Sequence, residues 1–166
     1  MSDMISEKET GPSGLVSRAI TGWALLGGGV LLMVVLMNTW SVIGNQFNLP
    51  FPGDFEMTEI GICIAAFTFL PYCQLTGANV TADIFTSGAS QRWLSVFSLA
   101  ASVVALGFSL LLLWRMHAGM MDKQLYGDIT AILAFPIWVA YVPILISLAL
   151  LAVASFVTLR NSLRDF

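Results

Sequence analysis

Charged side chains are scarce in this chain. Its 166 residues include seven Lys and Arg and ten Asp and Glu, so 10% are charged and 57% are apolar. Soluble domains usually carry about a quarter charged residues, and this chain has too few to cover a water-facing surface or to stay disordered. The basic residues are scattered and the net charge is −3, which argues against a nucleic-acid partner. The class that remains is an integral membrane protein.

Side chains that bind metals or carry out redox chemistry are also few. Cys63 and Cys73 lie ten residues apart in one predicted helix, about 15 Å from each other, so they cannot form a disulfide. His117 is the single histidine, and no Ser, His and Asp trio or metal-ligand cluster is suggested. We therefore expect no catalytic residue, no metal and no cofactor. The chain is predicted not to be an enzyme, and a membrane redox enzyme in particular is disfavoured.

The few charges are clustered, and the gaps between them predict the fold. Charge-free runs cover residues 19–53, 60–82, 93–114 and 129–159. A helix needs about 20 mostly apolar residues to cross the hydrocarbon core, and each run is long enough for one crossing. The runs do not alternate between apolar and polar residues as membrane strands would. The sequence thus predicts an all-α membrane protein with four transmembrane helices, at about residues 20–42, 55–75, 93–115 and 136–159.

The positions of Lys and Arg predict the orientation. Five of the seven lie in the two tails and the loop between helices two and three, whereas Arg115 and Lys123 lie on the opposite side. Basic residues concentrate on the cytoplasmic side, so both termini are predicted to be cytoplasmic. We expect a flexible N-terminal tail (1–14), a membrane domain (15–160) and a C-terminal tail (161–166). The first apolar run is longer than that of a secretory signal and should remain as an anchor.

Three acidic residues follow the break in the chain that precedes the second helix. Pro50, Pro52 and Gly53 stop helix formation, and then come Asp54, Glu56 and Glu59. Acids in a first turn complement the helix dipole, and Asp54 could cap the helix, so the trio is explained by the helix start. The alternative is that these acids face a partner on the outer side of the membrane.

Small residues and the lack of deep charges indicate packing against other helices. Small side chains let helices approach closely in lipid, and they occur at helix-packing spacing at Gly27, Gly28, Gly61, Ala65, Ala101 and Ala105. No predicted span has a charge at its centre, although carriers of ions usually place ionisable groups there. This favours an accessory subunit. The alternative is a self-sufficient four-helix, proton-coupled carrier that uses Glu59, the deepest acid.

Three stretches together resemble one known family. They are Pro52 to Glu59 (PGDFEMTE), Gly77 to Phe85 (GANVTADIF) and Thr130 to Tyr141, which includes Pro136 and Trp138. In order and spacing they resemble the small membrane subunit of tripartite ATP-independent periplasmic (TRAP) transporters, the DctQ-like family, over roughly residues 15–160. Asp83 matches the family pattern. The chain departs from that pattern at Asn79, where the family often has His, and after the first helix, where it often has Arg.

The resemblance implies a function that composition alone does not give. In such systems a periplasmic solute-binding protein captures a carboxylate-bearing solute, and a large membrane subunit carries it inward on a sodium gradient. The small subunit packs against the large one in the bacterial inner membrane as a scaffold. On this interpretation sodium coupling belongs to the large subunit. The acidic segment 54–59 and the predicted loop 115–128 would face the periplasm, near the docked binding protein.

Overall fold

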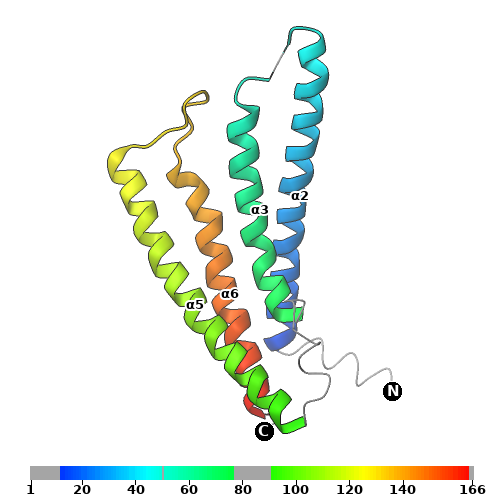
Figure 1. Cartoon of the computed structure of the whole chain (residues 1–166), viewed down its shortest axis with the longest axis vertical. Coiled ribbons are helices and arrows are strands. Elements are labelled where there is room, and N and C mark those ends of the chain that lie inside the picture. The colour runs from blue at the N-terminus through cyan, green and yellow to red at the C-terminus, as the bar shows by residue number, and fades with distance from the viewer. Residues whose placement is uncertain (1–11, 50, 77–90, 165–166) are drawn as a thin grey trace.

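The computed structural model describes residues 12–49, 51–76 and 91–164, and these residues form four α-helices. The helices are α2 (Pro12–Gln46), α3 (Asp54–Thr76), α5 (Gln91–Tyr126) and α6 (Trp138–Arg164), shown in Figure 1. Each contains an apolar stretch of at least 23 residues, which is enough to cross the hydrocarbon core. For the described residues, the predicted all-helical architecture with four membrane-spanning helices is confirmed. The orientation of the termini stays a prediction.

Helix α5 is much longer than the sequence analysis predicted. It continues past Arg115 to Tyr126, so His117 and Lys123 lie in the helix and not in a loop. The predicted loop 115–128 is therefore wrong, because polar residues end an apolar run without ending a helix. The helix stops where Gly127 adopts a positive φ of 64° and the Asp128 N–H bonds to the Lys123 carbonyl at 3.2 Å. This is the geometry of a glycine-ended Schellman cap.

The other helix ends also differ from the prediction. Helix α2 begins at Pro12, where proline's missing N–H costs nothing, so residues 12–14 of the predicted tail are helical. Helix α6 begins at Trp138, two residues late, because Pro136 pairs with Ile129 in an isolated antiparallel bridge. At its other end α6 continues through residues 161–164, which were predicted as a tail. Residues 1–11 of the predicted N-terminal tail lie outside the described residues.

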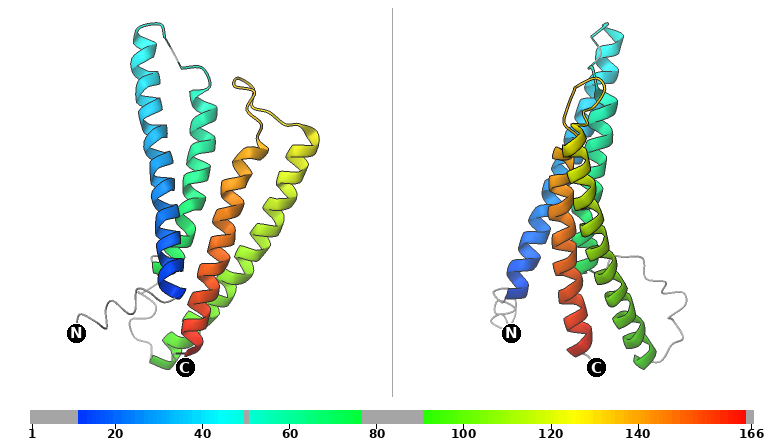
Figure 2. Two further views of the ribbon diagram at one scale, coloured as in Figure 1. Left: turned by 180° about the vertical axis from the view of Figure 1, so that it is seen from behind. Right: turned by 90° about the vertical axis from the view of Figure 1, so that its left-hand side faces the viewer.

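The helices stand in a row, in the order α2, α3, α6, α5. Helix α3 packs against α2 on one side and α6 on the other, and α5 packs against α6. Contacts between α2 and α6 are few. Seen edge-on in Figure 2, the row is thin, and Figure 1 shows α2 and α5 diverging toward the end that carries the α2–α3 and α5–α6 loops. At most 28% of any apolar stretch is buried, and in α5 the share is 6%. The row therefore leaves broad apolar faces uncovered.

Small residues set the close approach of α2 and α3. A Cβ added at Gly27 would overlap the Thr68 hydroxyl, and one added at Gly61 would overlap the side chain of Val34. Thr68 is buried, and its Oγ1 donates a hydrogen bond to the Ala65 carbonyl at 2.7 Å. The hydroxyl therefore cannot move aside without losing that bond. Farther along the row, the indole Nε1 of Trp23 in α2 donates to Ser147 Oγ in α6 at 2.9 Å.

Two adjacent glycines test this packing. We expect Gly27→Ala to destabilise the protein by about 1–3 kcal/mol, because overpacking a close contact forces the neighbours apart. Gly28→Ala is the matched control, since no atom lies within 4 Å of a Cβ at that position. It should be neutral or slightly stabilising, because alanine favours helix. Thermal unfolding of the purified protein in detergent measures the difference. Equal midpoints for the two variants would contradict this account of the α2–α3 interface.

Candidate functional site

The three predicted partner-facing acids all lie in the first two turns of α3, but their surroundings differ. Asp54 is engaged within the chain, because its Oδ2 accepts a hydrogen bond from Ser41 Oγ of α2 and its Oδ1 accepts one from the Phe55 N–H at 2.8 Å. Helix α3 begins at Asp54, and the carbonyl of Gly53 accepts the Met57 N–H at 3.0 Å. Gly53 therefore takes the cap position that was predicted for Asp54, and Asp54 lies in the first helical turn, where it joins α3 to α2.

Glu56 reaches across to the loop between α5 and α6. Its Oε1 accepts the backbone N–H of Ile132 at 2.7 Å, and its Oε2 accepts that of Leu133 at 3.1 Å. The loop is itself ordered by two hydrogen bonds between Thr130 and Phe135, of 2.9 and 3.0 Å. Both oxygens of this carboxylate are therefore used to hold a loop 76 residues away in sequence.

The loop also packs on the turn that precedes α3. Gly53 has a positive φ of 79°, and a Cβ there would overlap the side chain of Leu133. The α5 end of the same loop is fixed by an ion pair of 2.7 Å between Lys123 and Asp128. We call Gly53, Glu56 and loop residues 127–137 the loop cap. The cap joins α3, α5 and α6 at one end of the row, and Ile132 is its most exposed large apolar side chain, at 63%.

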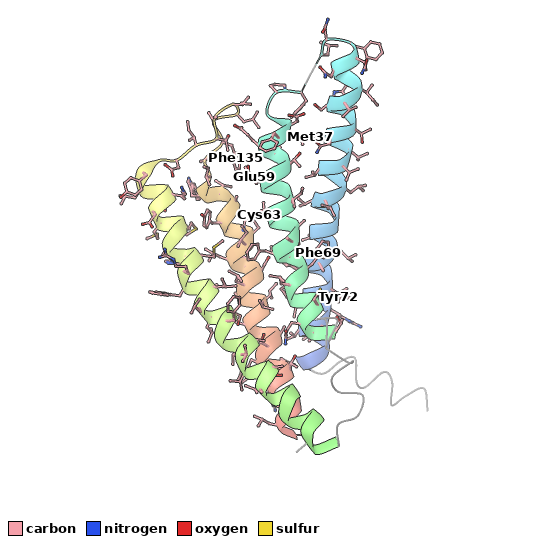
Figure 3. All side chains as sticks on the ribbon, viewed as in Figure 1. Met37, Glu59, Cys63, Phe69, Tyr72 and Phe135 are labelled. Atoms are coloured by element: carbon pink, nitrogen blue, oxygen red, sulfur yellow. The ribbon has the colours of Figure 1, made fainter. Side chains whose placement is uncertain are left out.

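Glu59 lies one turn farther along α3 and is exposed. Among the described residues it makes no hydrogen bond or ion pair. Figure 3 shows Glu59 and Cys63 on successive turns of α3. Cys63 is a free, exposed thiol, whereas Cys73 is free and half-buried. Glu59 is thus the one acid of the trio that the described chain leaves without a partner.

An open groove of about 540 Å³ lies beside Glu59, between the second half of α2 and the first half of α3. Its polar wall comes from Asn38, whose Nδ2 donates to Thr58 Oγ1 at 2.7 Å and to the Val34 carbonyl at 2.9 Å. The remaining lining is mainly apolar: Leu31, Val35, Thr39, Val42, Ile43 and Ile62. The lining contains no charged side chain. A groove of this kind suits apolar packing with a few hydrogen bonds.

The other predicted residues are distributed over the row. Gly27 and Gly61 lie buried where α2 meets α3, and Ala65 of α3 is also buried, while Gly28 borders open space. In α5, Ala101 is exposed and Ala105 is half-buried. Pro136 and Trp138 form the half-buried turn at the start of α6, where the Pro136 carbonyl accepts the Val139 N–H. Gly77, Asn79 and Asp83 lie outside the described residues.

Sequence reasoning missed the contact between Glu56 and the loop, and the groove. Both depend on which helices are neighbours, which a single sequence does not reveal. The sequence signal closest to the loop contact was the segment from Thr130 to Pro136, which stood out as a motif but not as a ligand for a carboxylate. Within residues 12–49, 51–76 and 91–164, no group of three or more His, Cys, Asp or Glu side chains could hold a metal ion. The site offers packing surfaces and hydrogen bonds.

The two glutamates of α3 provide a test of the loop cap. In Glu56→Gln one backbone N–H loses its acceptor, since the amide has a single oxygen. We expect the Ile132 and Leu133 amides to exchange with deuterium about tenfold faster, because exchange follows local opening. Glu59→Gln makes the same chemical change on the same helix and should leave both amides unaffected. Hydrogen exchange with mass spectrometry on the detergent-solubilised chain measures these rates. Unchanged exchange in Glu56→Gln would show that Glu56 does not hold the loop.

Comparisons with known proteins place these features in a family. A family model described as "Tripartite ATP-independent periplasmic transporters, DctQ component" matches residues 33–165. No curated protein and no solved structure matches the chain. The match covers α3, α5 and α6 in full, and residues 33–46 of α2. Because it extends over well more than half of the chain, the chain belongs to the DctQ component family of tripartite ATP-independent periplasmic transporters.

Proposed function

We propose that this chain is the small membrane subunit that packs against the large transport subunit of its system in the bacterial inner membrane. In that system the large subunit takes up a carboxylate-bearing solute, driven by a sodium gradient and supplied by a periplasmic solute-binding protein. Family membership supports the role of a transporter component. The observation that carries the packing role is the open row of helices, whose apolar faces are largely uncovered.

The distribution of charge supports a scaffold more than a solute path. A lone carrier would need an ionisable group in an enclosed site within the membrane. Glu59, the residue on which that alternative depends, lies on an exposed helix face beside Phe55 and Ile62, which are 75% and 49% exposed. The adjacent groove is lined without charge. The function that fits these surfaces is to widen and anchor the large subunit in the bilayer.

Co-purification tests the scaffold role. When the chain is expressed with the large subunit of its system, we expect the two to elute together in mild detergent at a fixed ratio, because apolar faces that pack on a partner hold it after lipid is removed. Size-exclusion chromatography with light scattering measures the mass of the complex. If the chain elutes alone, the proposed function fails.

The carrier alternative makes a different prediction. Reconstituted alone in liposomes, the purified chain should catalyse no proton-coupled uptake, and Glu59→Gln should change nothing. Uptake by the chain alone that is abolished by Glu59→Gln would establish the carrier and overturn the scaffold role.

We further propose that the loop cap faces the periplasm, near the docked binding protein, with both termini in the cytoplasm. The helix directions support opposite sides for the cap and the termini, since the start of α2 and the end of α6 lie at the end of the row opposite the cap (Figure 1). The basic residues of the tails support a cytoplasmic position for the termini. Asp54 is engaged with Ser41 of α2 and Glu56 with the loop, so any direct contact with the binding protein belongs to exposed residues such as Ile132.

Single cysteines test this orientation. In a chain with Cys63 and Cys73 replaced by serine, Ile132→Cys should react with a membrane-impermeant maleimide in spheroplasts, because its side chain is exposed on the cap. Leu163→Cys is the matched control, near the end of α6 and 58% exposed. It should react with the reagent only after the membrane is permeabilised. Adding solute-loaded binding protein should slow the labelling of Ile132→Cys. The reverse labelling pattern would refute the orientation, and unslowed labelling would refute docking at the cap.

A further inference from the structure

One face of α3 is exposed along most of the helix and carries a single charge. Its exposed residues recur at helical spacing: Phe55, Glu59, Ile62, Ala66 and Leu70. Residues three and four apart lie on the same side of a helix, so these form one stripe. We call them the α3 stripe. Helices α2 and α6 pack on two sides of α3, and the stripe is one of the faces that this helix leaves open.

The α3 stripe continues into the groove between α2 and α3. Ile62 belongs to both, and Thr58, the residue before Glu59, forms part of the groove wall. The groove extends along α2 from Leu31 to Ile43, which is about three turns of helix. Stripe and groove together make one continuous surface of mainly apolar residues, and the Glu59 carboxylate lies one turn from the Phe55 end of the stripe. The surface has the length over which two transmembrane helices pack.

Glu59 lies where direct contact of its carboxylate with lipid would be costly. It lies five residues inside the start of α3, about 7.5 Å along the helix axis, and directly precedes the charge-free run 60–82 of a helix that is long and apolar enough to cross a membrane. A carboxylate at the edge of a spanning segment is expensive to keep ionised where it faces lipid, and such residues usually face protein and pair with another group. Glu56, one turn earlier, is satisfied by the Ile132 and Leu133 amides, whereas the described residues offer Glu59 nothing.

The chemistry of the surface defines what would complete it. A cation supplied from outside the chain would satisfy the carboxylate, and apolar side chains would fill the groove of about 540 Å³. Ala66 and Cys63 are small and exposed beside the stripe's larger residues, so a second helix can approach closely there. A lipid acyl chain would fill the groove but would leave the carboxylate unpaired. A partner helix that bears a basic residue meets both requirements.

We propose that the α3 stripe and the α2–α3 groove receive a transmembrane helix of the large subunit, with an Arg or Lys of that helix paired to the carboxylate of Glu59. This deepens the proposed function and rests on it, because it names the face through which the scaffold is held. The remaining faces of the row, including the exposed side of α5, are then left to lipid.

Charge reversal tests the ion pair. In the co-expressed complex, Glu59→Lys should lower the amount of large subunit recovered per small subunit by about tenfold, because it sets two cations against each other in a desolvated contact. Glu59→Gln should give a smaller loss. Asp122→Lys is the matched control: it reverses an exposed acid on α5 and should leave recovery unchanged. Wild-type recovery with Glu59→Lys, or equal losses in Glu59→Lys and Asp122→Lys, would overturn the proposal.

Photo-crosslinking tests the face without disturbing the charge. A photo-crosslinking phenylalanine analogue in place of Ile62 should give an adduct with the mass of the large subunit, whereas the same analogue in place of Val104, 68% exposed on α5, should not. Adducts from Ile62 with lipid, with the binding protein or with a second copy of this chain would each overturn the proposal. So would equal adducts from both positions.

The two levels of inference fail separately. If the wild-type chain does not co-purify with the large subunit, the proposed function itself fails. If it co-purifies but Glu59→Lys has no effect and Ile62 yields no large-subunit adduct, the scaffold role stands and this assignment of its contact face fails.

Discussion

Hydrocarbon gives no reward for burying an apolar side chain, and this constraint shapes the whole arrangement. In water, four helices as apolar as these would have to close around a common core. In lipid the surroundings are as apolar as the side chains, so what remains to hold helices together is close packing and hydrogen bonding. The row α2, α3, α6, α5 needs no closed core, and its apolar stretches are at most 28% buried.

Within this constraint, a few specific contacts fix the row. Close approach at Gly27 and Gly61 brings α2 against α3, and the hydrogen bond from Asn38 to Thr58 joins the same two helices. At the loop-bearing end, Glu56 ties α3 to the loop that joins α5 and α6. Charged side chains are few in this chain, and several polar side chains are placed at helix-to-helix contacts. That is where a hydrogen bond fixes a neighbour, because bilayer lipid does not compete for it.

The number of helices followed from the sequence, but their ends and partners did not. Charge-free runs predicted four spans because a charge at mid-membrane is costly whatever the fold. The end of α5 was predicted eleven residues early, at Arg115, because a change in hydropathy was taken as a change in backbone structure. The actual stop depends on Gly127 in a left-handed conformation, a backbone signal independent of charge. The contact between Glu56 and the loop could not be predicted from the sequence, because a carboxylate can accept backbone N–H groups from residues of any type.

Glu56 and Glu59 show how position alone divides two identical side chains between internal and external roles. Both belong to the acidic start of α3, and from the sequence they were one feature. Glu56 points to a loop with two N–H groups to offer, so its charge stabilises this chain. Glu59, one turn on, faces outward along a mainly apolar stripe where the described chain supplies no donor. On our proposal, this unpaired carboxylate makes the scaffold specific for its partner. An apolar face can pack against any apolar helix, whereas the carboxylate favours a helix that carries a cation at the matching position.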